Sequence, residues 1–216
     1  MALNTYADLQ AALGTWNVDK TNLPTADLIA LAEARMSRDL RLRMQEVDRA
    51  LVTSIGSRYV ALPPNVVEPL ALFLELASGR CELVNVPDAM ETSGSPGRPG
   101  LWTVDGANLA FERPADQVYS LTFKALQGFD LADGANAAAA WLYATYPDIY
   151  LAAGNVEAAL WLQDDAQAER WQLRYADAVG AINEKEQRAR ALAALRVDPA
   201  LQPRVRRRET FDITRG

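Results

Sequence analysis

The chain contains no histidine, a single cysteine (Cys81) and only three lysines (Lys20, Lys124 and Lys185). The absence of histidine excludes Ser-His-Asp triads, Cys-His dyads and the common zinc sites, because each needs an imidazole that titrates near neutral pH. A single cysteine cannot form an internal disulfide bond. Only carboxylate, lysine or backbone chemistry remains open for catalysis, and we expect no metal or cofactor.

The sequence also lacks an apolar run of the roughly 18 to 20 residues that a membrane-spanning helix requires. Its first stretch, MALNTYADLQAALGTW, is amphipathic and does not show the basic segment followed by an apolar block that marks a secretion signal. We therefore expect a protein that is cytosolic where it is made and has no membrane partner.

The composition is that of a globular protein: 216 residues, 50% hydrophobic and 23% charged, which suffice for one core or for one core with an inserted subdomain. The formal net charge of −6 disfavours a general nucleic-acid binder, which normally presents a basic surface that displaces counterions.

Both ends of the chain show helical spacing of apolar residues. Thr5 and Asp8 predict a capping box that opens a first helix ending near Asn17. A second helix is predicted from about Pro24 to about Arg43.

The C-terminal third returns to the helical pattern. Pro147 predicts a restart after a kink, and Asp164-Asp165 predicts the beginning of the last, long helix. The buried stripe predicted for this last helix is Trp171, Tyr175, Ala178 and Ile182.

The middle of the chain shows the alternation that is typical of strands. ALVTSIGSRYVALPP predicts two short strands around Gly56, and LWTVDGANLAF predicts a hairpin centred on Asp105-Gly106. PLALFLELASGRCELVNVP predicts two further strands, although Leu70 to Leu76 also fit a helical turn. The breaker-rich loop SGSPGRPG predicts a flexible surface tip.

We therefore predict an α+β fold that is mainly an α-helical bundle, formed by the N- and C-terminal helices, with an inserted antiparallel β meander. Residues 1–46 and 135–195 would form the bundle, residues 47–134 the β-rich insertion, and residues 196–216 an extended C-terminal docking tail.

Three acidic residues near the predicted junction of two helices are candidates for catalysis or metal binding. Glu157 with Asp164 and Asp165 suggests a carboxylate pair or a hard-metal site. Helix capping and a solvated turn explain these residues better, because nothing nearby in the sequence supplies further ligands.

The chain closes with RVRRRETFDITRG, an arginine cluster followed by alternating polar and apolar residues. A solvated tail, a nucleic-acid contact and a docking peptide all fit this pattern, and we favour the docking peptide because alternating side chains suit an extended segment that binds a groove or a sheet edge. The predicted binding residues are Arg204, Arg206, Arg207, Arg208, Phe211 and Ile213.

Several stretches, in the right order, resemble the phage head-to-tail adaptor (connector) proteins, the family that includes tail tubular A and gatekeeper proteins. TYADLQAALGTW and LPTADLIALAEARMSRDLRLR are similar to its opening helices, and RYVALPPNVVEPLAL is similar to its strand-to-loop element. GANLAFERPADQVYSLTFKAL resembles its paired strands, and YPDIYLAAGNVEAALWLQDDAQAERWQLRYADAVGAINE its C-terminal helical hairpin. The resemblance covers Thr5 to about Arg190.

This resemblance implies a non-enzymatic virion protein at the head-tail junction. It would form a ring with neighbouring subunits, most simply a homododecamer, beneath the portal protein. The ring would extend the DNA channel, let genomic DNA pass without sequence-specific binding, and attach the next tail protein, a nozzle or tail-tube component. The tail would grip the portal. Two alternatives stay open: a carboxylate-dependent phage-associated glycan hydrolase and a monomeric helical interaction module.

Overall fold

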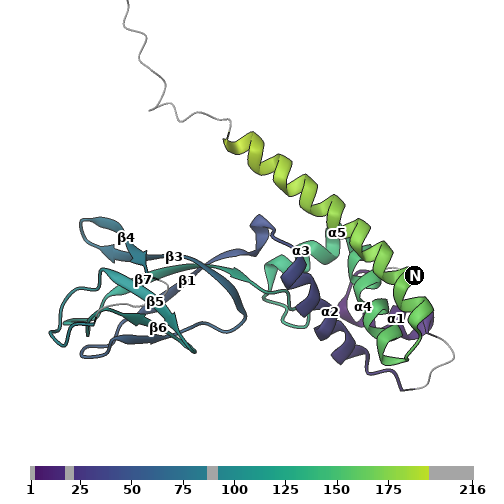
Figure 1. The fold of residues 1–216 in the computed structure, drawn as a ribbon, viewed down its shortest axis with the longest axis horizontal. Helices are drawn as coiled ribbons and strands as arrows, with labels where there is room; N and C mark the ends of the chain where they lie inside the picture. The colour runs from purple at the N-terminus through teal and green to yellow at the C-terminus, as the bar shows by residue number, and fades with distance from the viewer. Residues whose placement is uncertain (1–2, 18–21, 87–91, 195–216) are drawn as a thin grey trace, which may run out of the picture.

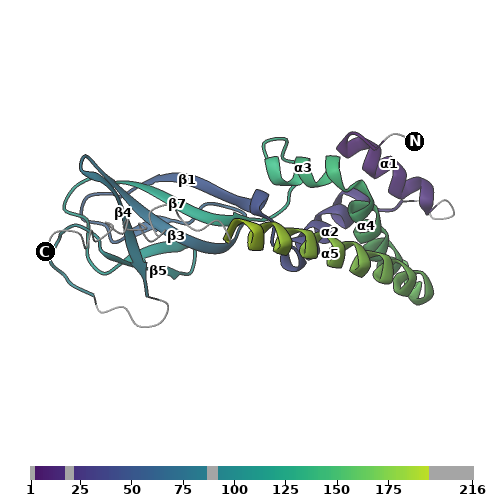
Figure 2. The ribbon, with the colours of Figure 1, turned by 90° about the horizontal axis from the view of Figure 1, so that it is seen from above.

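The structure is a computed structural model that describes residues 3–17, 22–86 and 92–194. Figures 1 and 2 show an elongated molecule, with helices at one end and a curled β-sheet at the other. The α-helices of the described residues are α1 (Tyr6–Trp16), α2 (Thr25–Asp39), α3 (Ala137–Thr145), α4 (Pro147–Trp161) and α5 (Asp165–Ala194).

The strands form one sheet in the order β1-β7-β3-β4-β5-β6-β2. A short 3₁₀ helix, η1 (Arg43–Gln45), leads into it. The strands are β1 (Glu46–Val52), β2 (Tyr59–Ala61), β3 (Val66–Leu76), β4 (Gly79–Asn85), β5 (Leu101–Asp105), β6 (Asn108–Phe111) and β7 (Ser120–Gln127). All strand pairs are antiparallel except β4–β5, which is parallel, so the sheet is mixed.

Each end of the molecule has its own hydrophobic core. The helical core includes Leu13, Met36 and Tyr150, and it gathers side chains from every helix. The sheet core is a separate cluster that includes Trp102 and Phe123 on the concave side of the curl. Below, these two regions are called the helical part and the sheet.

The predicted fold class, an α-helical bundle with an inserted antiparallel meander, is wrong. The β region is a seven-stranded mixed sheet that curls into a half-barrel around its own core. The sequence pattern located extended segments but not their partners. A meander assumes that neighbours in sequence pair with each other, whereas here the first strand pairs with the last.

The predicted hairpin around Gly56 shows this difference. Both strands exist, but β1 pairs with β7 and β2 pairs with β6. Gly56 itself has a φ of +76°, a turn conformation that glycine adopts without strain. The neighbouring hairpin prediction is confirmed, because β5 and β6 pair around Gly106.

The segment around Leu70 is a strand and not a helical turn. β3 runs through it and pairs with β4 across the turn that ends at Gly79, which has a φ of +124°. Pro69 lies at an irregularity in the β3–β7 ladder, where the missing N–H does not interrupt regular pairing.

The first helix begins as predicted. The Thr5 hydroxyl accepts from the Asp8 amide at 3.1 Å, and the Asp8 carboxylate accepts from the Thr5 amide at 2.9 Å. α2, in contrast, ends at Asp39 and not near Arg43. Leu40 and Leu42 are both fully buried, and residues two apart reach the same core only in an extended chain.

The predicted helix boundaries at Pro147 and Asp165 are confirmed. In the predicted stripe of α5, Tyr175 and Ile182 are buried, but Trp171 is only partly covered and stacks against Trp16 with ring centroids 5.3 Å apart.

Candidate assembly surfaces

The six residues predicted to bind a partner, Arg204, Arg206, Arg207, Arg208, Phe211 and Ile213, lie outside the described residues. The described element that leads to them is α5, which is 30 residues long and therefore about 45 Å in length. Figure 1 shows that its last described turns project beyond the other helices and rise away from the sheet.

The middle of α5 is fixed to the end of α2. The Tyr175 hydroxyl donates to the Asp39 carboxylate at 2.7 Å, and the Asn183 amide donates to the Asp39 carbonyl at 3.0 Å. The second bond satisfies one of the carbonyls that a helix C-terminus leaves free. Burial and the bond to Asp39 raise the pKa of the Tyr175 hydroxyl, so it stays a donor at neutral pH.

The next turns of α5 make polar contacts with the base of the sheet. Glu186 accepts from Arg43 at 3.4 Å, and Arg190 lies 3.8 Å from Glu46. A cavity of about 220 Å³ lies between α5 and Arg41. These contacts set the direction in which α5 leaves the helical part.

A partly buried ion pair connects three helices. The Arg35 guanidinium lies 2.7 Å from the Glu157 carboxylate and also donates to Gln172 at 3.2 Å. α2, α4 and α5 are therefore held together by one arginine fork, which suits planar, multidentate contacts better than lysine does.

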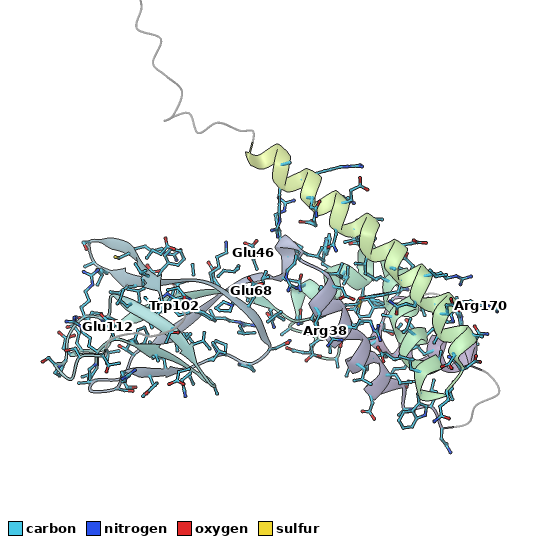
Figure 3. All side chains as sticks on the ribbon, viewed as in Figure 1. Arg38, Glu46, Glu68, Trp102, Glu112 and Arg170 are labelled. Carbon is cyan, nitrogen blue, oxygen red and sulfur yellow. The ribbon has the colours of Figure 1, made fainter. Side chains whose placement is uncertain are left out.

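Large apolar side chains remain exposed on the helical part. The exposed fraction reaches 62% for Trp161 and 64% for Leu173. Trp16, Leu31 and Leu160, which also belong to helices of this part, are exposed as well. Arg170 of α5, labelled in Figure 3, lies at the end of the molecule that is far from the sheet, and Leu173 follows it on the same helix. Exposed apolar side chains of this size are typical of protein contact surfaces.

The loop SGSPGRPG was predicted to be a flexible tip, but the structure anchors it. The Glu112 carboxylate, labelled in Figure 3, accepts from the Gly100 amide at 2.7 Å and from the Leu101 amide at 2.9 Å. The Ser93 and Gly97 amides donate to the carbonyls of Glu112 and Pro114. The sequence gives no sign of this role, because Glu112 differs from other acidic residues only by its burial in the fold.

We predict that Glu112→Ala lowers the free energy of unfolding by about 2 to 3 kcal/mol, because two backbone N–H groups lose their acceptor. Urea unfolding measures this loss. The matched control is Glu82→Ala on β4, an exposed carboxylate, for which we expect a change within about 0.5 kcal/mol. Equal losses in the two variants would contradict the anchoring role.

The carboxylates considered for catalysis do not form a pair. Glu157 is bound to Arg35, and Asp164 accepts from the Gln167 amide at 3.1 Å, which is a helix-capping contact. Among the residues that the structure describes, no group of three potential metal ligands comes together. The capping interpretation of Asp164 is thus confirmed.

No helix in residues 3–17, 22–86 or 92–194 is both long enough and apolar enough to cross a membrane.

Two separate cores, a long projecting helix and exposed apolar side chains are features of a structural protein that assembles with others. The model of the SU10 adaptor protein family matches residues 4–198, and the chain belongs to this family. Among curated proteins, no significant match is found. The chain is a structural phage adaptor, a virion component that interacts with other phage head and tail proteins, and the predicted resemblance is confirmed.

Proposed function

We propose that this adaptor forms a ring of twelve copies beneath the portal at the head-tail junction, extends the DNA channel, and attaches the next tail component without enzymatic activity. The observation that carries the proposal is the family match over residues 4–198. The resemblance of the sequence to head-to-tail adaptors supports the same role.

Ring formation requires two different surfaces on each copy, because a heterologous contact repeated by rotation closes on itself. The exposed apolar side chains of the helical part, Trp161 and Leu173 among them, supply one surface suited to such a contact. The helical part packs as one cored unit, so it can keep a fixed angle between neighbours.

The C-terminal tail is proposed to bind the portal. Its arginines, Arg204 and Arg206 to Arg208, would pair with acidic groups, while Phe211 and Ile213 would lie on one side of an extended segment. α5 supports this role because its last described turns project from the helical part, and the tail follows α5 directly in the sequence.

The DNA channel is the third part of the proposal. Each copy carries a net charge of −6, and a ring of such copies disfavours tight binding of the DNA backbone. DNA would therefore pass through without sequence-specific contacts.

Electron microscopy of the full chain mixed with its cognate portal tests the assembly. We expect a closed twelvefold ring on one face of the portal. Light scattering of the adaptor alone, at the same concentration, provides the control for assembly that does not depend on the portal. Portal particles without added density at saturating adaptor, or with single bound copies, would contradict the proposal.

A further inference from the structure

The chain passes between the helical part and the sheet twice, once before β1 and once after β7. The second crossing is residues 128–131, here called the exit segment. Phe129 is buried in the helical core, so the exit segment belongs to the contact between the two parts. How firmly it is held decides how firmly the sheet is placed against the helices.

Side chains of α2 hold one side of the exit segment. The Phe129 amide donates to the Ser37 hydroxyl at 2.9 Å, and the Leu131 amide donates to the Glu33 carboxyl at 2.6 Å. Ser37 and Glu33 are four residues apart and therefore lie on one face of the helix. The backbone amides of Phe129 and Leu131, two residues apart, thus donate hydrogen bonds to side chains on one face of α2.

The opposite side of the exit segment is also bound. The Gly128 carbonyl accepts from Asn65 at 3.1 Å and from Asn136 at 2.8 Å, and the Gly128 amide donates to the Asn65 carbonyl at 3.0 Å. A Cβ at position 128 would lie 2.4 Å from the Asn65 side-chain oxygen. The start of the segment is therefore fixed, and any release has to occur farther along, at Leu131.

Glu33 is buried in this contact, and the exposed fraction of its side chain and backbone together is 5%. Burial raises the pKa of Glu33 to about 7, and the charge of Asp130 adds to the rise, while hydrogen bonds from Leu131 and Tyr150 oppose it. The Tyr150 hydroxyl donates to the same carboxyl at 3.3 Å and stays protonated, because burial raises its own pKa. Tyr6 on α1 faces the same acidic groups, because burial first and then the charges of Glu33, Asp130 and Asp27 raise the pKa of its hydroxyl.

A cavity of about 420 Å³ lies beside this carboxyl, between α2 and the beginning of β3. Glu33, Arg38, Asn65, Val67 and Asp130 are among its lining residues. The cavity gives an ionised Glu33 access to water and to a cation. The cation is Arg38, an exposed residue of α2 that lines the cavity and is labelled in Figure 3. Such a site returns water to a charged carboxylate and so removes the desolvation cost of the buried position.

We propose that Glu33 is a protonation-dependent latch between the helical part and the sheet. The neutral carboxyl stays buried and holds the Leu131 amide. The ionised carboxylate turns into the cavity toward Arg38 and leaves that amide to water, so that Ser37 alone holds the exit segment on α2. Near neutral pH the two forms coexist, and a partner that covers the cavity favours the closed form with uptake of a proton.

The direction of the pH dependence follows from the raised pKa. The folded, latched state binds the proton more tightly than a solvated glutamate, whose pKa is 4.5. The stabilisation is therefore complete below pH 4.5 and is lost as the pH rises through about 7.

Nuclear magnetic resonance of the ¹⁵N-labelled full chain between pH 5.5 and 8.5 tests the latch. We expect the Leu131 amide signal to titrate with a midpoint near 7. Its protection from hydrogen exchange, after correction for base catalysis, should fall about fivefold between pH 7 and 8, in proportion to the neutral fraction of a group with a pKa near 7. The Phe129 amide should keep its protection. Glu33→Gln should abolish the titration of Leu131.

Asp130→Asn is the second variant, and it keeps the latch. Removal of its negative charge should lower the midpoint for Leu131 without abolishing the titration. A Leu131 signal that does not change between pH 5.5 and 8.5 would overturn the latch, as would titration that survives in Glu33→Gln. If Glu33→Gln does not fold, a midpoint that is unchanged in Asp130→Asn would overturn it equally.

Discussion

Truncation of the chain after Val197 is expected to abolish binding to the portal, with a loss of affinity of at least about a hundredfold, while thermal unfolding and helix content stay nearly unchanged. Charge-assisted pairs contribute about 1.5 to 3 kcal/mol each, so the loss of several arginines with Phe211 and Ile213 exceeds the roughly 2.7 kcal/mol that a hundredfold requires. The described core residues end at Ile182, so the truncated chain keeps all of them. Binding isotherms and thermal melts of both proteins measure the two effects.

Two double variants separate the parts of the tail. Phe211→Ala with Ile213→Ala should weaken binding about tenfold or more even at high salt, because the lost contact is apolar. Thr210→Ala with Thr214→Ala changes the other side of the alternation and should leave affinity within about threefold. A truncated protein that still forms the portal complex with unchanged affinity would show that the tail is only a solvated end.

Replacement of Trp102 by alanine is expected to cost about 3 to 5 kcal/mol of the free energy of unfolding. Trp102 is 1% exposed, and it meets Phe123 edge to face with ring centroids 6.2 Å apart. Its indole N–H donates to the Leu83 carbonyl at 3.1 Å. β5 pairs with β4 through only two residue pairs, so this side chain is a main connection between the two strands. Urea unfolding followed by circular dichroism measures the loss.

Trp161→Ala is the matched control, because it removes the same side chain from a position that is 62% exposed. We expect it to change the free energy of unfolding by less than about 1 kcal/mol. If the two tryptophan variants lose the same stability, Trp102 does not hold the sheet together.

The parts of the fold that could be predicted are those set by residues close in sequence. The capping box of Thr5 and Asp8 acts over three residues, and the Gly106 turn acts over four. The pairing of Glu46 with Leu126 spans most of the sheet sequence, and no local pattern encodes it. The early end of α2 depends on the core into which Leu40 and Leu42 fit, and that core forms only in three dimensions.

The same limit applies to the functional residues. Asp164 could be recognised as a cap because its role is local. The burial of Glu33 could have been predicted, because this acidic residue lies on the apolar side of α2 with Ala32 and Met36. Glu112 had no such signal, because its partners are amides that approach only when β5 and β6 pair.

The antiparallel pairing of β1 with β7 has an evolutionary consequence. Glu46 lies opposite Leu126, and the Gln45 side chain reaches the Gln127 carbonyl at 3.4 Å, so the chain enters and leaves the sheet at neighbouring points. A lineage can lengthen, shorten or exchange the sheet without moving the helix ends to which it is attached. The sheet is therefore the half of the molecule that can be changed with the least effect on the helical part, because both of its connections leave from one place.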